Sequence, residues 1–373
     1  MFPTNETISL ENSTESIYVN GIPSFAEQGL EDLYGSLYAS LPQLQCGDLT
    51  QVHTYAAWRD GQLSTLLLYF VDGRRIRVIN EGMGIPTEEL DRFADTLFAH
   101  YTKISIISLH AQSISDRKPQ RPCARMPVTE DIVIHLPGNE QSYLAQLGKS
   151  SRKSLKQNLS RAQHELPGFH HTVVAGEAIS ETLVEQVIGF NHARMAQKQR
   201  RSAIDEKARM HLMQLLRARG WVGVISTRDR ICAGTLACRF GDAVYSIVNA
   251  HDPKYDGYSM GNLSRHLLIN ASIRAGARRF HLLGGQLSTK RNALGRRQKL
   301  YAIRLYRSRL SMVRDLFNLA TLARESLLYR LKAWLEDLHT HPHPDKIAHA
   351  ALYLRKALRA TRNQSRRLSG SAA

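Results

Sequence analysis

The sequence contains no long apolar segment and no closely spaced cysteines. No run approaches the roughly 18 apolar residues that a membrane-spanning helix needs, so we expect no such helix. The first 20 residues are polar and include acids, unlike the start of a secretory signal. The four cysteines, Cys46, Cys123, Cys232 and Cys238, are too scattered for a typical metal site. We therefore expect a protein without bound metal in a reducing cytoplasm.

Acidic residues are few compared with basic ones. The 373 residues include 50 Lys and Arg but only 33 Asp and Glu, which gives a formal net charge of +17. This excess indicates a polyanionic partner such as tRNA, an anionic membrane surface or a phosphate-rich substrate, without distinguishing among them. Apolar residues make up 43% and charged residues 22%, as in ordinary globular proteins. The length suits two similar domains plus a tail.

The basic residues form two clusters. The first lies on a predicted helix and includes Arg152, Lys153 and Lys156, which are candidate substrate-binding residues. The second ends the chain, from Arg355 to Arg367. Neither cluster contains the aromatic residues that usually accompany basic ones on a nucleic-acid surface. A solvated helix face and a disordered tail are therefore the alternative interpretations.

One pattern, three strands followed by a helix and a strand, occurs twice. The strand-like runs begin near Val52, Gln62, Arg74, Trp221, Ile231 and Ala243. Each start in the second copy follows its counterpart in the first by 169 residues (52 to 221, 62 to 231, 74 to 243). Asp60-Gly61 and Asp72-Gly73 separate the first three runs and predict hairpins. After each third strand come a loop with glycines, an amphipathic helix and a short apolar strand.

The loop of the second copy is suited to phosphate binding. It spans residues 251–262 and contains Gly257 and Gly261, whose backbone freedom would let successive N–H groups point at one anion. The helix that follows adds its positive N-terminal end, and its first turn contains no acid. We predict that this loop holds a phosphate.

The matching loop of the first copy has lost these properties. Gly82 and Gly84 are present, but Pro86 removes one N–H donor. Glu88 and Glu89 place negative charge at the start of the following helix, where an anion would lie. The first copy is therefore predicted to be degenerate.

These features resemble the GNAT N-acyltransferase fold, in which a loop between the fourth strand and its helix holds the pyrophosphate of acyl-CoA. The stretch Lys254-x-x-Gly257-x-Ser259-x-Gly261 is similar to a relaxed form of the superfamily signature Arg/Gln-x-x-Gly-x-Gly/Ala. Two tandem copies with a degenerate first copy resemble the Fem-type aminoacyltransferases that build peptidoglycan bridges. They equally resemble the acetyltransferases of bacterial cellulose and exopolysaccharide gene clusters.

The resemblance is strongest over residues 142–300 and rests on four motifs. These are Tyr143-Leu144-Ala145-Gln146-Leu147 before a basic helix, Ala233-Gly234-Thr235-Leu236-Ala237, Asp252-Pro253-Lys254-Tyr255 with the later Gly261, and Gly284-Gly285 before Lys290. His281 stands where the family often has Asp. The implied fold is α/β (α+β), with two tandem GNAT-like domains, each a mixed sheet flanked by helices. The expected boundaries are a disordered N-terminus (1–20), a degenerate domain (21–140), a catalytic domain (141–315), a helix (316–338) and a basic tail (339–373).

The resemblance also implies roles for individual residues. Backbone N–H groups near Val248, Asn249 or Ala250 would polarise the acyl carbonyl. The candidate cofactor-binding residues are Val248, Asn249, Ala250, Gly257, Ser259, Met260, Gly261, Asn262 and Lys290. His251, with Asp252 beside it, is the candidate proton acceptor because histidine titrates near neutrality, and Tyr258 could protonate the leaving thiolate. Alternatively, His251 only caps the strand, Tyr258 packs on the loop and Lys290 lies on the surface.

The expected function is that of a cytoplasmic N-acyltransferase. Acetyl-CoA or another acyl-CoA would be the cosubstrate, and the acceptor would be an amine of a small-molecule or lipid-linked saccharide used in the envelope or in polysaccharide synthesis. The first alternative is a Fem-type transferase that uses aminoacyl-tRNA, with the basic helix holding the tRNA. The second is a non-catalytic GNAT-like protein that docks on an anionic membrane through residues 316–338, where leucines lie beside arginines.

Overall fold

The computed structural model describes residues 7–9, 14–113, 117–228, 230–283 and 294–340. The first half contains β1 (Thr7–Ser9), β2 (Glu15–Tyr18), α1 (Ala26–Tyr34), η1 (Leu37–Ala39), α2 (Leu41–Leu44), β3 (His53–Arg59), β4 (Gln62–Asp72), β5 (Arg75–Val78), α3 (Thr87–His100), β6 (Ile106–Gln112) and β7 (Cys123–His135).

The second half begins with α4 (Glu140–Gln146), α5 (Lys149–Glu165), β8 (His170–Ala175), η2 (Gly176–Ala178), α6 (Glu181–Gln197) and α7 (Glu206–Arg219). It continues with β9 (Trp221–Ser226), β10 (Ile231–Phe240), β11 (Ala243–His251), η3 (Pro253–Tyr258), α8 (Met260–Arg274), β12 (Arg279–His281), β13 (Arg296–Tyr306), α10 (Arg309–Arg314) and α11 (Leu316–Thr340).

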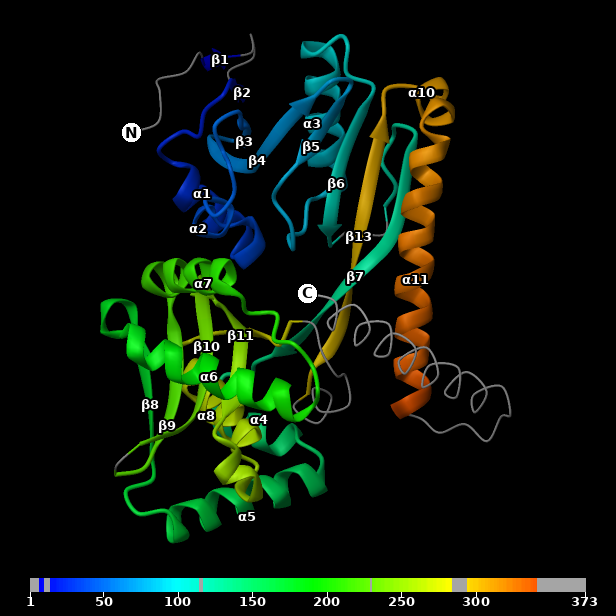
Figure 1. Cartoon of the computed structure of the whole chain (residues 1–373). Helices are drawn as coiled ribbons and strands as arrows, with labels where there is room; N and C mark the ends of the chain where they lie inside the picture. The colour runs from blue at the N-terminus through cyan, green and yellow to red at the C-terminus, as the bar shows by residue number, and fades with distance from the viewer. Residues whose placement is uncertain (1–6, 10–13, 114–116, 229, 284–293, 341–373) are drawn as a thin grey trace, which may run out of the picture.

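The described strands form one sheet in which the two halves exchange strands. The order is β1-β2-β3-β4-β5-β6-β13-β7-β12-β11-β10-β9-β8. β13, from the second half, pairs with β6 of the first half, whereas β7, from the first half, pairs with β12 of the second. β7 and β13 also pair with each other along ten positions, and Figure 1 shows them crossing side by side between the two lobes. The two repeats are therefore joined through the sheet itself.

The predicted repeat is present in the structure. β3, β4 and β5 begin at residues 53, 62 and 75, and β9, β10 and β11 begin at residues 221, 231 and 243. The first hairpin turns through Asp60 (φ 52°) and Gly61 (φ 76°), the left-handed conformation that two-residue hairpin loops require. In each copy the strand after the helix pairs in parallel with the third strand, β6 with β5 and β12 with β11.

Helices cover both faces of the sheet in the second lobe. The apolar residues of α6 and α7 pack into one core with β10 and β11, including Val184, Val187 and Leu216. α8 contributes Leu268 and Ile269 to another core, which it shares with Tyr143 of α4. In the first lobe, α3 buries Leu90, Phe93, Ala94, Leu97 and Phe98, the residues that the helical pattern predicted. The mixed α/β fold with helix-flanked sheet is thus confirmed.

Two of the expected boundaries differ from the structure. Residues 15–18, within the segment expected to be disordered, form β2 because Ile17 is fully buried and the strand pairs with β3. A division at residue 140 would also separate β7 from its neighbours β12 and β13. Sequence patterns mark strands but not their partners, so the exchange of strands was not foreseen. The basic tail beyond residue 340 lies outside the described residues.

The helix expected over residues 316–338 is α11, which packs along β7. Leu319 and Leu322 are buried against the sheet, and the Tyr329 hydroxyl donates to Glu130 at 2.9 Å. The opposite side of α10 and α11 exposes large apolar side chains: Leu310, Val313, Leu316, Phe317, Leu327, Leu328, Leu331 and Trp334. None of the described helices is long and apolar enough to cross a membrane.

A buried carboxylate joins the start of α11 to strands β5 and β13. Asp315 is 3% exposed and accepts hydrogen bonds from Arg304 of β13 at 3.0 Å and from Arg75 of β5 at 3.2 Å. The Tyr306 hydroxyl donates to the same carboxylate at 2.9 Å and the Asn318 amide at 2.7 Å. Four donors on one buried carboxylate compensate its desolvation.

We predict that Asp315→Asn lowers the free energy of unfolding by about 3–5 kcal/mol, because two arginines lose a buried partner. Chemical denaturation followed by circular dichroism measures this change. Asp95→Asn is the matched control, since Asp95 pairs with Arg121 but its side chain is 60% exposed, and a loss below about 1 kcal/mol is expected there. Equal losses for the two variants would contradict the role assigned to Asp315.

Candidate functional site

One edge of β11 in the second repeat is only partly paired within the described strands. β11 pairs with β12 only at Ala243, Val244 and Tyr245, and it then continues to His251 with β10 as its only partner among the described strands. On its other edge β12 pairs with β7 over the same three residues, Arg279 to His281, and the Leu282 N–H donates to the carbonyl of Ile132 at 2.8 Å. Beyond Tyr245, no described strand pairs with this edge of β11, and we call this part of the strand edge the wedge.

A β-bulge lies just beyond Tyr245. Ser246 pairs with Ala237 and Val248 pairs with Leu236, so Ile247 is an extra residue in β11. A bulge changes the direction of the local N–H groups and frees one of them from the ladder. Val248, Asn249 and Ala250, the residues expected to polarise a carbonyl, all follow the bulge. The bulge adds Ile247 to the backbone groups available for this role.

The loop after β11 is built differently from the expectation. Ser259, and not a glycine, adopts the left-handed conformation (φ 53°, ψ 40°), whereas Gly257 and Gly261 have no positive φ. Gly261 is needed for close approach instead: a Cβ there would lie 3.3 Å from Nδ1 of His251 and 3.6 Å from Oδ1 of Asn249. The small residue thus lets the start of α8 pack against the end of β11, and the Asn249 amide donates to the carbonyl of Gly261 at 2.9 Å.

The start of α8 offers backbone donors to a ligand. The N–H groups of Asn262 and Leu263 already donate to the carbonyl of Ser259. Those of Met260 and Gly261 precede the first carbonyl that a helix can supply, so they remain available. The first turn contains no acidic residue, and Ser259 makes no side-chain cap. An anion at this end of α8 would meet both these donors and the positive end of the helix dipole.

The equivalent strand edge in the first repeat is covered by the chain itself. The loop after β5 runs along β6: the Gly82 N–H donates to the carbonyl of Ala111 at 2.9 Å, and the Ser113 N–H donates to that of Met83 at 2.8 Å. Gly84 forms a parallel bridge with Ser113. These hydrogen bonds continue the contact between the first repeat's third strand and β6 beyond the end of β5.

Protein groups also occupy the first turn of α3. Glu89 is 4% exposed, and its carboxylate accepts from Arg59 at 2.7 Å and from Thr65 at 2.8 Å. Glu88 pairs with Arg117. The two carboxylates hold the negative charge that the helix end favours. The acids that the sequence places at the start of α3 are thus held by protein groups, whereas the first turn of α8 contains none.

The expected catalytic side chains lie apart from one another. His251 is at the end of β11, and its Nε2 lies 2.8 Å from Oδ1 of Asp256, not of Asp252. Asp252 instead accepts from the Lys254 N–H at 3.0 Å and so caps η3. The Tyr258 hydroxyl donates to Glu165 of α5 at 2.8 Å, which raises the pKa of Tyr258. The carboxylate partner of His251 is therefore Asp256, and Tyr258 joins the loop to α5.

A histidine–aspartate pair that was not predicted lies at the closed end of the wedge. His281 pairs with Tyr245, the last position at which β11 pairs with β12, and its ring stacks on the Tyr245 ring at 4.1 Å. Its Nδ1 lies 2.6 Å from Oδ2 of Asp131 of β7. Its Nε2 is buried and has no hydrogen-bond partner within the described residues. Asp131 is 150 positions away in the sequence, so no local pattern could have revealed the pair.

The basic row on α5 is exposed. Lys149, Lys153 and Lys156 are exposed and Arg152 is half-buried, and no carboxylate of the described residues lies within ion-pair distance of these four. Their positions place them on one face of the helix. The basic helix predicted from the sequence is α5, which begins after Gly148 and is preceded by the short helix α4. Gly284, Gly285 and Lys290 lie outside the described residues.

Comparison with known proteins agrees with this architecture. Residues 149–291 match the model of a family described as an acetyltransferase (GNAT) domain. The crystal structure of FemX is similar at a TM-score of 0.59 and 10% identity, covering 81% of this chain and 97% of that one. L-PGS from Bacillus licheniformis is similar at a TM-score of 0.49 and 13% identity, covering 78% and 93%. No curated protein matches the sequence.

The chain has the GNAT acyltransferase fold. The wedge beside β11 lies within the matched region, whereas β5 and β6 lie before it. Within the described residues, no group of three or more His, Cys, Asp or Glu could hold a metal ion. The GNAT domain thus offers backbone donors and two histidine–carboxylate pairs as its chemical groups.

Proposed function

We propose that the protein is an acyl-CoA-dependent N-acyltransferase whose second repeat alone is active. The observation that carries this proposal is that β11 continues past its last described pair with β12, through a bulge, to a helix start without acids. A long, thin ligand with phosphates at one end and a reactive carbonyl at the other has the shape and charge for such a site. Acyl-CoA has both features.

The donor's orientation follows from the positive end of α8. Its diphosphate would lie at the N–H groups of Met260 and Gly261, because these donors and the helix dipole favour anions. The thioester arm would then extend along β11 toward the closed end of the wedge. In that direction it reaches the bulge at Ile247 and then the His281 ring. The thioester carbonyl would accept from a backbone N–H beside the bulge, which stabilises negative charge on its oxygen during attack.

His281 is the better-positioned proton acceptor in this arrangement. Asp131 holds Nδ1, which fixes the ring so that Nε2 can accept a proton. The acceptor amine would attack the carbonyl carbon, forming a C–N bond as the C–S bond breaks. The amine proton passes to Nε2, and the thiolate that leaves is protonated from solvent or from the imidazolium. His251 lies at the opposite end of the wedge, near the phosphates, and so is farther from this chemistry.

The acceptor is proposed to be an anionic amine, an amino sugar of an envelope or polysaccharide precursor. The exposed row of Lys149, Arg152, Lys153 and Lys156 supports an anionic acceptor, because these cations have no acidic partner among the described residues. Sugar nucleotides and lipid-linked saccharides both have phosphates that such a row attracts.

A Fem-type transferase that uses aminoacyl-tRNA is the second candidate. The likeness to FemX over nearly the whole of that chain favours it, as does the basic row. Against it, α6 and α7 bury their apolar faces in the core of the sheet, so they do not extend as a separate arm for a large RNA. Calorimetry with CoA and with charged tRNA at several salt concentrations separates the two: only RNA binding should weaken steeply with salt.

We predict that Gly261→Asp abolishes CoA binding, because it puts a negative charge at the start of α8. Gly84→Asp should leave CoA binding intact, since the first repeat's loop after β5 is hydrogen-bonded to β6. Gly261→Ala tests whether bulk alone is responsible, and it should weaken binding less than Asp does. Isothermal calorimetry gives all three affinities. Similar losses for Gly84→Asp and Gly261→Asp would refute the assignment of the second repeat.

His281→Gln should lower kcat by about 10²–10⁴-fold and change KM for acetyl-CoA little, because it removes a proton acceptor but no phosphate contact. Release of free thiol from acetyl-CoA, with amino-sugar nucleotides as acceptors, measures both constants. Asp131→Asn should give a smaller fall in kcat and shift the pH profile, as expected for a residue that orients the ring. If His251→Gln is the more damaging variant, the base lies at the other end of the wedge.

Replacing Arg152, Lys153 and Lys156 with Gln should leave CoA affinity nearly unchanged and raise KM for an anionic acceptor. If tRNA is the donor, the same variant should instead lower the salt dependence of tRNA binding, by about one unit of slope per lost contact. The control removes the same charge from the far side of the molecule, at Arg324, Arg330 and Lys332. If the kinetic constants are unaltered with every acceptor, the basic row contacts only solvent and binds no substrate.

A further inference from the structure

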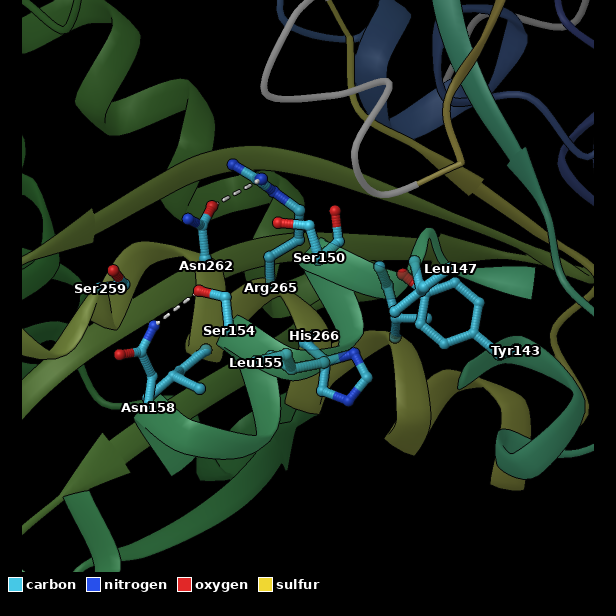
Figure 2. Close-up of a pocket in the computed structure, with 13 residues that line it drawn as sticks. Tyr143, Leu147, Ser150, Ser154, Leu155, Asn158, Ser259, Asn262, Arg265 and His266 are labelled. Carbon is cyan, nitrogen blue, oxygen red and sulfur yellow. Dashed lines mark hydrogen bonds between the residues drawn. The ribbon is translucent and has the colours of Figure 1, made fainter. Parts of the chain in front are cut away.

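A pocket lined by both polar and apolar side chains lies beside the start of α8, between this helix and α5. Its volume is about 250 Å³. Figure 2 shows Ser150 and Ser154 of α5 facing Ser259, Asn262 and Arg265 from the α8 side. Hydroxyl, amide and guanidinium groups thus line the pocket together, which favours a ligand with several hydrogen-bond acceptors.

The pocket contains positive charge without a neutralising acid. Arg265 is half-buried, and its side chain donates to Asn262 at 3.4 Å, with no ion-pair partner among the described residues. Burial lowers the pKa of Arg265, and the positive charge of Arg194 on α6 contributes. The Nε of Arg194 is itself buried without a partner in the described part of the chain. Two neighbouring guanidiniums without a carboxylate repel each other, so an anion between or beside them would be stabilising.

A neutral histidine forms part of the same wall. His266 is 7% exposed, and its ring stacks on Tyr143 at 5.6 Å. Burial lowers the pKa of His266 to about 4, so it is uncharged near pH 7. Its Nδ1 is buried and finds no hydrogen-bond partner among the described residues. An unsatisfied nitrogen costs free energy, and its presence in this wall is a second sign that the pocket accommodates a polar group.

We propose that this pocket binds a phosphomonoester, the 3′-phosphate of CoA. The proposal rests on the proposed function, because it needs the diphosphate of CoA at Met260 and Gly261. Arg265 follows Gly261 by four residues, about 6 Å along the helix at 1.5 Å per residue. In CoA one ribose links the diphosphate to the 3′-phosphate, so a diphosphate at the helix start brings the second phosphate to Arg265. The guanidinium can then donate two parallel hydrogen bonds, and Ser150 and Ser154 can donate from α5.

The hydroxyl groups in the wall of this pocket argue against the binding of other parts of the substrates there. An acyl chain would leave the hydroxyls of Ser150 and Ser154 without partners. The 3′ end of a tRNA has phosphodiesters but no phosphomonoester. The two candidate donors therefore differ in the group that this pocket would bind. The pocket therefore also serves as a test of the donor.

The experiment compares CoA with dephospho-CoA, which lacks only the 3′-phosphate, on the full chain by calorimetry. The unmodified protein should bind CoA about ten- to a hundredfold more tightly, as expected for hydrogen bonds to a charged group. Arg265→Gln should bring the two affinities together by weakening CoA while leaving dephospho-CoA unchanged. Arg324→Gln, which removes an exposed charge on α11, should keep the full difference.

Three results would overturn the proposal, and they are distinguishable. Equal binding of the two ligands by the unmodified protein places the 3′-phosphate elsewhere but leaves CoA as donor. If Arg265→Gln weakens the binding of both ligands equally, Arg265 does not bind that phosphate. Absence of binding by either ligand, with charged tRNA bound, rejects the donor as well. If Arg265→Gln lowers the melting temperature, Arg265→Lys and Ser154→Ala replace it, and each should reduce the CoA preference in part.

Discussion

The functional geometry depends on the short parallel pairing of β11 with β12. Ala243, Val244 and Tyr245 pair with β12, and beyond them β10 is the only described strand that pairs with β11. The bulge at Ile247 lies in this part of β11 and changes the direction of its N–H groups. His281 lies at the last of the paired positions, and β11 leads from there to η3 and to the start of α8. In the first repeat the loop after β5 hydrogen-bonds to β6.

The exchange of β7 and β13 joins the two repeats into one continuous sheet. Each lobe receives its last strand from the other half of the chain, so the lobes are continuous through hydrogen bonds and share a sheet. Asp315 strengthens this junction with donors from β5 and β13. β7 also brings Asp131 to His281, which makes the first half of the sequence a contributor to the site of the second. The first half of the chain therefore contributes a strand and a carboxylate to the second lobe.

Positive groups without acidic partners occur at three neighbouring places in the second lobe. The start of α8 lacks acids, Arg265 has no carboxylate partner, and the row on α5 is unpaired within the described residues. Positive charge is thus concentrated where a phosphate-bearing donor and an anionic acceptor would meet, while the acids of α3 remain bound to protein groups.

The sequence by itself determined the features that depend on near neighbours. The duplicated strand pattern, the turn at Asp60-Gly61, the buried face of α3 and the acids at its start could all be predicted, because a few consecutive residues specify each of them. Only the tertiary structure decided which strands pair, since an apolar strand fits many partners. It replaced the expected glycine turn with Ser259, gave Gly261 a packing role, and turned His251 to Asp256. The pair of His281 with Asp131 and the pocket of Arg265 arise where distant segments meet, and no local pattern encodes such a meeting.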